Sequence, residues 1–145
     1  MKNIKTNTSA NRMGMPFIKI QEGDFAGMVL VLDSNSYSNY LSLDIYNQLK
    51  DLLETMEVTC FSGGVEDINE IKLVIGNVAI HGNHLNMLFF VDKAIEYYKH
   101  LSKIIGLPVC GIIGAQFMSV HNWEIDYDRR IIIIPDYDSD YLSIN

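Results

Sequence analysis

The stretch Val29-Leu30-Val31-Leu32-Asp33-Ser34-Asn35-Ser36 decides how this chain is expected to fold. Residues 28–32 form an unbroken apolar run of the length and kind that is typical of a strand buried on both faces. The run leads directly into Asp33, and a carboxylate at the end of a buried strand is costly unless something there uses or pairs it. Taken alone, an aspartate at this position is more often a turn residue or a helix cap. The residues around it must therefore decide between a turn and a functional loop.

The composition indicates a single acidic globular domain. The chain has 145 residues, a net charge of −7, 48% hydrophobic residues and 20% charged residues, which argues against disorder. An acidic chain of this kind lacks the positive charge that would neutralise a row of phosphates, so we expect no nucleic-acid partner. The longest purely aliphatic run, residues 131–134, is far shorter than the roughly 20 residues that span a bilayer, so we expect no membrane partner.

The cysteines and the N-terminus indicate the compartment. Cys60 and Cys110 are isolated in the sequence, with no spacing typical of a metal site. A disulfide between them is possible, but two reduced, half-buried thiols are the favoured interpretation. The polar residues 1–15 contain no apolar segment of the secretory type. We therefore expect a cytoplasmic protein, with a removed signal peptide as the open alternative.

Short apolar segments separated by turns fill most of the chain, and this pattern predicts a barrel or a sandwich. Two helices interrupt it. The first is predicted from apolar residues spaced three and four apart over residues 41–56, with Asn39 or Ser42 as its N-cap. The second follows Asp92 as N-cap and ends at Gly106. The expected organisation is a flexible N-terminal arm (residues 1–14), one domain (residues 15–135) and an acidic tail (residues 136–145). The predicted strands are residues 17–20, 28–32, 58–61, 71–75, 78–80, 85–91, 109–114 and a final hairpin over residues 123–134.

A second motif makes the interpretation more specific. It is Gly111-Ile112-Ile113-Gly114-Ala115-Gln116-Phe117-Met118, followed by Trp123-Glu124-Ile125-Asp126-Tyr127. An apolar strand ending in Asp-Ser-x-Ser and followed later by this motif resembles the retropepsin-like (retroviral-type) aspartic proteases, which have bacterial relatives. The resemblance covers most of the chain, from about residue 16 to residue 134. It implies a mainly β fold, a closed β-barrel of the retropepsin-like acid protease type with two inserted or flanking α-helices.

The resemblance also implies roles for the residues of the first motif. Asp33 would be the catalytic carboxylate. Ser34 would tie the two catalytic loops together across a dimer axis. Asn35 and Ser36 follow them at positions that would contact the substrate.

A glycine-bearing flap would close over the substrate in this family. Residues 62–67 fall at the flap position, and Gly63, Gly64 and Val65 would contact the substrate there. Two adjacent glycines are a weak signal by themselves, because any hairpin could use them. The segment 112–114 would pack under the active-site loop, and the second helix resembles an insertion relative to the smallest family members.

The chemistry of such a site requires two chains. A pair of carboxylates that share a proton can activate a water, since one accepts its proton while the other donates to the peptide carbonyl. This chain has one candidate loop, so the resemblance implies a homodimer in which each chain gives Asp33. The expected partners are therefore a second copy and a peptide or protein substrate.

Asn35 departs from the family pattern, which has glycine at this position. Asparagine is one of the few residues that tolerate a left-handed backbone, so the loop could keep its shape. Its side chain could instead occupy the position of the water or hydrogen-bond Asp33. Two hypotheses follow: an active aspartic endopeptidase, or a catalytically inactive retropepsin-like protein with a peptide-binding or structural role.

No metal or other cofactor is expected. His81 and His84 are three residues apart, but Gly82 and Asn83 between them disfavour the helix that would bring them together. The tail residues Asp136, Asp138 and Asp140 lack the glycine and the terminal glutamate of a calcium loop.

Overall fold

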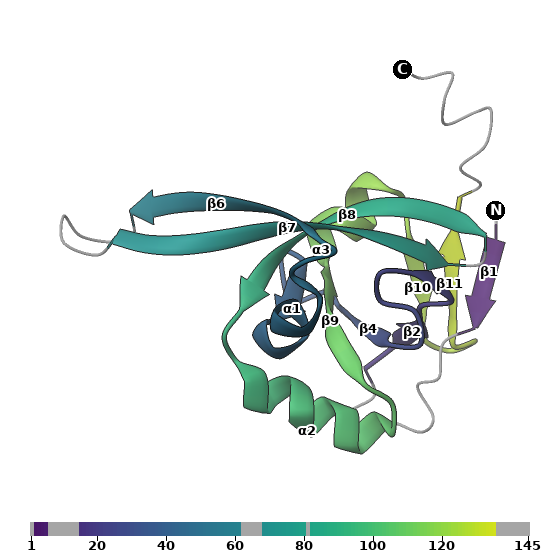
Figure 1. Cartoon of the computed structure of the whole chain (residues 1–145). Coiled ribbons are helices and arrows are strands. Elements are labelled where there is room, and N and C mark those ends of the chain that lie inside the picture. The colour runs from purple at the N-terminus through teal and green to yellow at the C-terminus, as the bar shows by residue number, and fades with distance from the viewer. Residues whose placement is uncertain (1, 6–14, 62–67, 81, 136–145) are drawn as a thin grey trace.

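The protein is mainly β in a computed structural model that describes residues 2–5, 15–61, 68–80 and 82–135 (Figure 1). The side chains of residues 2–5, 56–61 and 68–71 are outside this description. The strands are β1 (Lys2–Lys5), β2 (Phe17–Lys19), β3 (Glu22–Gly23), β4 (Val29–Asp33), β5 (Tyr40–Ser42), β6 (Glu54–Phe61), β7 (Ile68–Ile80), β8 (Asn83–Asp92), β9 (Val109–Gly114), β10 (Glu124–Asp126) and β11 (Ile131–Ile134). The helices are α1 (Leu43–Leu49), α2 (Ile95–Ile105) and α3 (Ala115–Val120). None of these helices has the length and apolar character needed to cross a membrane.

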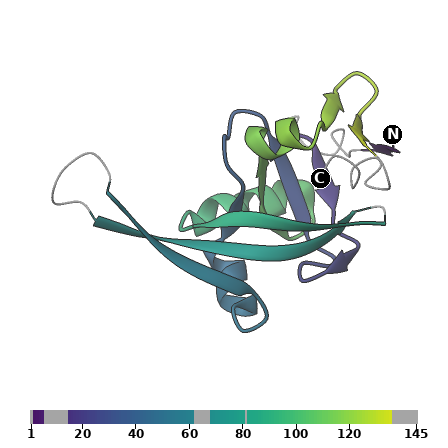
Figure 2. The same ribbon diagram turned by 90° about the horizontal axis from the view of Figure 1, so that it is seen from above.

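The main sheet runs in the order β2-β4-β9-β5-β8-β7-β3, with β6 also paired to β7. The pairs β4–β9 and β5–β8 are parallel and the others are antiparallel. The two ends of this path, β2 and β3, follow each other in the chain with only Ile20 and Gln21 between them. The sheet is therefore curled, as a half-barrel, around the core (Figures 1 and 2). Complete closure of the barrel stays a prediction.

A second, three-stranded sheet has the order β1-β11-β10. The predicted final hairpin is present as β10 and β11, which pair antiparallel. Within the expected N-terminal arm, Lys2–Lys5 pairs with Ile131–Ile134 as an antiparallel strand. The flexibility of the arm stays a prediction. The bounds of the domain and of the acidic tail stay predictions.

Strand β4 is buried on both faces, as its apolar run predicted. Leu30 and Leu32 point into the larger core cluster, inside the curled sheet. Val29 and Val31 alternate with them and point into a smaller cluster on the opposite face. Helix α2 covers that face with Tyr98 and Leu101. Cys110 lies in the larger cluster as a buried free thiol.

The first predicted helix was wrong in its extent. Leu41 belongs to β5, the helix is confined to Leu43–Leu49, and Met56 belongs to β6. The spacing misled because Leu41, from a strand, and Leu53, from a turn, enter the same core as the helical Ile45. Ser42 occupies the N-cap position, without a side-chain capping hydrogen bond.

The second helix was predicted closely. It ends at Gly106, whose φ of 81° is the left-handed conformation expected of a C-cap glycine. Asp92 is not its N-cap residue, since the helix begins at Ile95. The Asp92 carboxylate instead accepts the backbone N–H of Ala94, at 3.0 Å.

Strand β7 is longer than predicted, because it continues through Gly76 and Asn77 where a turn was expected. Gly76 is needed there for packing, since a Cβ atom would meet the ring of Phe25. The β6–β7 hairpin projects from the body of the molecule in both views (Figures 1 and 2). Within the described residues, its outer part, 57–61 with 68–72, pairs only with itself.

Candidate active site

Asp33 is the last residue of β4, and it pairs in parallel register with Gly114, the last residue of β9. The chain turns sharply after it. The backbone N–H of Asn35 donates to Oδ1 of Asp33 at 2.9 Å, and the N–H of Ser36 donates to the carbonyl of Asp33 at 3.1 Å. The loop thus holds the carboxylate half-exposed at the edge of the sheet, beside the exposed Ser34.

Asn35 does not adopt the left-handed backbone that its replacement of glycine suggested. Among the described residues, the non-glycine residues with positive φ are Asn122 and Arg130. The loop therefore turns without the conformational freedom of glycine, and the Asn35 amide reaches the carboxylate. The Asn35 side chain is exposed.

Gly114 lies beneath the loop, where no side chain would fit. A Cβ atom at Gly114 would meet the carbonyl groups of Tyr37 and Ser38. The next residue, Ala115, donates its N–H to the carbonyl of Ser36 at 2.7 Å, and Gln116 donates to that of Tyr37 at 3.0 Å. The start of α3 therefore fixes the loop from below by two backbone hydrogen bonds.

Asn39 connects the loop to two strands, a role that the sequence analysis missed by treating it as a helix cap. Its side chain is buried; Oδ1 accepts the N–H of Gly114 at 2.8 Å and Nδ2 donates to the carbonyl of Leu88 at 3.2 Å. Its own carbonyl accepts the N–H of Phe90 at 2.9 Å. One residue thus links β8 to the end of β9, where Asp33 is held.

Tyr97, on α2, is a second residue that sequence reasoning missed. Burial raises the pKa of its phenol, and the negative charges of Asp33 and Asp92 raise it further. The neighbouring Tyr98 is buried, and its hydroxyl donates to Oδ2 of Asp92 at 2.8 Å. No local signal in the sequence indicated that Tyr97, one residue before Tyr98, is within reach of the charge of Asp33.

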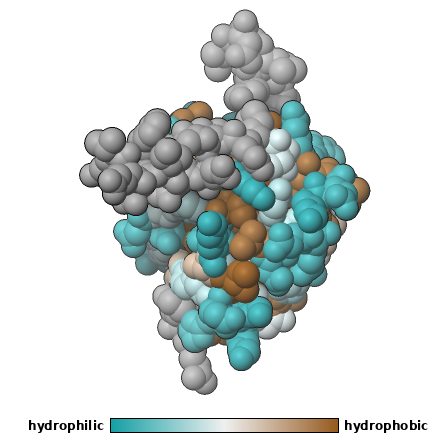
Figure 3. Space-filling model, turned by 60° about the vertical axis from the view of Figure 1, so that its left-hand side comes forward, coloured by the Kyte–Doolittle hydropathy of each residue, from teal (hydrophilic) through white to brown (hydrophobic). Residues whose placement is uncertain are grey.

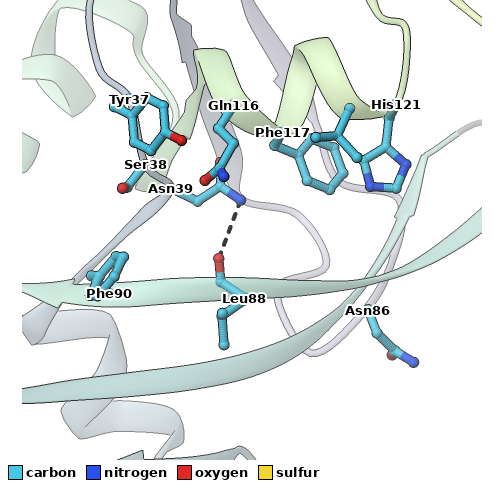
Figure 4. A pocket seen from close by; sticks show the side chains of 10 residues that line it. Tyr37, Ser38, Asn39, Asn86, Leu88, Phe90, Gln116, Phe117 and His121 are labelled. Carbon is cyan, nitrogen blue, oxygen red and sulfur yellow. Dashed lines mark hydrogen bonds between the residues drawn. The ribbon is translucent and has the colours of Figure 1, made fainter. Parts of the chain in front are cut away.

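A cavity of about 270 Å³ opens beside the loop, between β8 and α3 (Figure 4). Three of its lining residues, Tyr37, Leu88 and Val120, are among the exposed large apolar side chains of the described part of the chain. Figure 3 shows apolar side chains bordered by hydrophilic ones on one face of the molecule. His121 also lines the cavity. Its ring stacks on that of Phe117 with the two ring centroids 4.2 Å apart, and burial lowers the pKa of the His121 imidazole. The lining is Tyr37, Ser38, Asn39, Asn86, Leu88, Phe90, Gln116, Phe117, Val120 and His121.

The structure places the first four predicted site residues, Asp33 to Ser36, in one loop. Gly63, Gly64 and Val65 lie outside the described residues, so their position over Asp33 stays a prediction. The described residues contain no group of three or more His, Cys, Asp or Glu side chains that could hold a metal ion.

Two solved structures share this arrangement of strands and helices. The retroviral protease-like domain of Ddi1 from Leishmania major is 15% identical, with a TM-score of 0.56 over 84% of this chain and 89% of that one. A retropepsin-like aspartic protease from Rickettsia conorii is 16% identical, with a TM-score of 0.51 over 92% of this chain and 88% of that one. No family model and no curated protein sequence matches the chain. The structural likeness shows that the chain has the retropepsin-like fold.

Proposed function

We propose that this protein is a homodimeric aspartic endopeptidase whose two Asp33 carboxylates activate a water to hydrolyse peptide bonds. The observation that supports it is the Asp33 loop, at the end of a buried strand in a retropepsin-like fold. There the carboxylate pairs in register with Gly114 and accepts the Asn35 amide at 2.9 Å. The catalytic group is thus half-exposed, while its backbone is held from both sides.

The reaction follows from placing two such carboxylates together. Two negative charges at contact distance are unfavourable, so the pair shares one proton. The charged carboxylate accepts a proton from water as that water attacks the peptide carbonyl, and the protonated one donates to the carbonyl oxygen. The Asn35 amide orients the carboxylate throughout, because the hydrogen bond comes from the backbone.

The dimer brings the two loops together about a two-fold axis, where each Ser34 hydroxyl contacts the opposite loop. Closure of the curled sheet into a barrel belongs to this proposal, and the pairing of residues 17–23 with β4 at one end and with β7 at the other supports it. The substrate binds as an added strand under the β6–β7 hairpin, with residues 62–67 as the flap.

The alternative is an inactive relative that binds peptides without cleaving them, and Asn35 in place of glycine is the observation that favours it. An asparagine side chain beside the dyad could occupy the position of the attacking water.

The test compares wild-type protein with Asp33→Asn on a mixed peptide library from acidic to neutral pH. Cleavage by wild type alone supports the proposal. Equal cleavage by both proteins, or none by either, contradicts it.

The substitution Asn35→Gly distinguishes the active endopeptidase from the inactive relative. For an active enzyme, we expect the rate to stay within about tenfold of wild type, because the amide that holds Asp33 is retained. Asp33-dependent cleavage that is present only after Asn35→Gly identifies the natural protein as the inactive relative. Asn47→Gly, at an exposed position on α1, controls for the general effect of this substitution.

A further inference from the structure

The cavity between β8 and α3 lies on the same face of the main sheet as the Asp33 side chain. Side chains alternate along a strand, so Asp33 and Val31 on β4 point to one side. Val31 pairs with Ile112 on β9, and Ile112 pairs with Tyr40 on β5. Tyr40 in turn pairs with Phe90 on β8, and the centroids of their two rings are 6.1 Å apart. The Asp33 face therefore continues across the sheet to Phe90, which lines the cavity.

The order of the strands gives the separation between the cavity and Asp33. Strands β9 and β5 lie between β4 and β8, and neighbouring strands are about 4.8 Å apart, so Phe90 lies about 14 Å across the sheet from β4. Gln116, which also lines the cavity, follows two residues after Gly114, the strand partner of Asp33. An extended peptide rises about 3.3 Å per residue, so the cavity lies about four or five residues from a bond cleaved at Asp33.

The loop that carries Asp33 also forms one side of the cavity. It continues into Tyr37, whose carbonyl accepts the N–H of Gln116 at 3.0 Å. Both residues line the cavity. Asn39 then joins the loop to β8, because its Nδ2 donates to the carbonyl of Leu88 at 3.2 Å (Figure 4). The same segment of chain therefore positions Asp33 and shapes the cavity.

The lining of the cavity suits a large apolar group. Tyr37 and Val120 present exposed apolar surface at its edge, and the stacked rings of Phe117 and His121 lie between them on α3 and after it. Burial lowers the pKa of the His121 imidazole, so this ring is neutral at neutral pH. Among the described residues that line the cavity there is no Asp, Glu, Lys or Arg, so a charged group would lose its water there without a partner.

The size of the cavity suits one side chain. Its volume of about 270 Å³ is below the roughly 300–1,000 Å³ of sites that hold drug-sized ligands. Aromatic rings attract one another beyond the area that they bury, and the cavity offers the rings of Tyr37, Phe90 and Phe117. An aromatic side chain of an extended peptide therefore matches both the volume and the lining.

We propose that the cavity between β8 and α3 is a distal substrate subsite, which takes an aromatic side chain about four or five residues from the scissile bond. This inference rests on the proposed peptidase function, because the position is counted from Asp33. In the proposed dimer, the two-fold axis gives two such cavities, one on each side of the scissile bond.

The first experiment measures kcat/KM for dodecapeptides that share one cleaved sequence and differ at a single position, which carries Ala, Glu, Leu, Phe or Trp. Trp or Phe at the fourth or fifth residue from the scissile bond should raise kcat/KM at least about tenfold over Ala, because the side chain is buried in the cavity. Glu should give no increase. Val120→Glu and Leu88→Ala, two changes at exposed side chains of the lining, should each lower the Trp-to-Ala ratio to less than about threefold.

A matched control is Leu52→Glu, at an apolar side chain that is 72% exposed after α1 and does not line the cavity. It should leave the Trp-to-Ala ratio unchanged. Light scattering should give Val120→Glu the same mass as wild type. A lower mass for Val120→Glu would show that the cavity is an interface between two copies of the chain, and would overturn the inference.

A second experiment detects binding without cleavage. N-acetyl-tryptophanamide is added to ¹⁵N-labelled wild-type protein, and NMR follows the backbone amides. The amides of residues 86–90 and 116–121 should show saturable shifts that N-acetyl-alaninamide does not cause and that Val120→Glu removes. Absence of these shifts in wild type would overturn the inference, whether or not the protein is a peptidase.

The two experiments distinguish failure of the inference from failure of the peptidase function, because Asp33→Asn is included in the cleavage assay. If cleavage depends on Asp33 but Val120→Glu and Leu88→Ala retain the wild-type Trp-to-Ala ratio, the inference is wrong and the function stands. If N-acetyl-tryptophanamide binds at the cavity but no peptide is cleaved in an Asp33-dependent way, the peptidase function is wrong and the cavity remains a site for aromatic side chains.

Discussion

At the scale of single residues, the site depends on backbone groups that side chains hold in place. The amide of Asn35 contacts Asp33 whichever side chain the residue carries. The sequence could predict the position of Asp33 at the end of β4, because an apolar strand ending in a carboxylate has a local pattern. It could not predict Asn39, because the partners of that side chain, Gly114 and Leu88, are brought near only by the fold.

Replacing Asn39 tests this connection. Asn39→Ala leaves the buried N–H of Gly114 and the carbonyl of Leu88 without their partner, and each such loss costs about 1–3 kcal/mol. We expect a lower free energy of unfolding in urea. Asn47→Ala, exposed on α1, should change it by less than about 0.5 kcal/mol. Equal effects of the two substitutions would show that the Asn39 contacts are unimportant.

The raised pKa of the buried Cys110 thiol predicts how the free energy of unfolding changes at alkaline pH. Burial raises its pKa from 9.0 to about 12, so the folded protein keeps a proton that the unfolded chain releases. The resulting stabilisation is complete below about pH 9 and is lost as the pH rises towards 12. The unfolding free energy of wild type should therefore fall more steeply between about pH 8 and about pH 10 than that of Cys110→Ala. Parallel urea-unfolding profiles for the two proteins would contradict the assignment.

At the scale of elements, the strands with continuous apolar runs were the most predictable. Strand β4 and helix α2 lie close to where the pattern placed them, since a buried run and a C-cap glycine are local signals. The pattern failed where different elements share one core, as with Leu41 and Leu53. It also failed at Gly76, whose packing partner Phe25 is remote in sequence.

Substitutions at two glycines, Gly114 and Gly106, distinguish an effect on the geometry of the site from an effect on the stability of the fold. Gly114→Ala forces the Tyr37–Ser38 backbone away and displaces the loop, and a shift near 1 Å can cost about 100-fold in rate. Gly106→Ala instead strains a positive φ at the far end of α2 and costs about 1 kcal/mol of stability. We expect kcat for peptide cleavage to fall only in Gly114→Ala. Similar kcat values for both variants at a temperature where both are folded would show that Gly114 does not position the loop.

At the scale of the whole molecule, one chain supplies one Asp33 loop. Length and the single motif predict this from sequence, whereas the contacts between two copies depend on surfaces that no local pattern describes. The proposed dimer gives a quantitative expectation for mixed chains.

Mixing wild type with an equal amount of Asp33→Asn and allowing subunit exchange should produce about one quarter wild-type dimers. Since only these dimers carry two competent carboxylates, the activity per wild-type chain should fall by about half. As a control, wild type is mixed with an equal amount of Leu52→Ala, which alters an exposed side chain after α1. This mixture should leave the activity per chain unchanged. Activity proportional to the wild-type chains alone would indicate a monomeric catalyst.

The outer part of the β6–β7 hairpin is expected to open locally more often than the rest of the molecule. Within the described part of the chain, its backbone hydrogen bonds join two strands with no third strand beside them, and such two-stranded ribbons are marginally stable alone. They can open locally while β4 and β9 remain closed, so their amides should exchange with deuterium much earlier than those of the sheet. A peptide bound along the ribbon would slow that exchange, which would report occupancy whether or not a bond is cut.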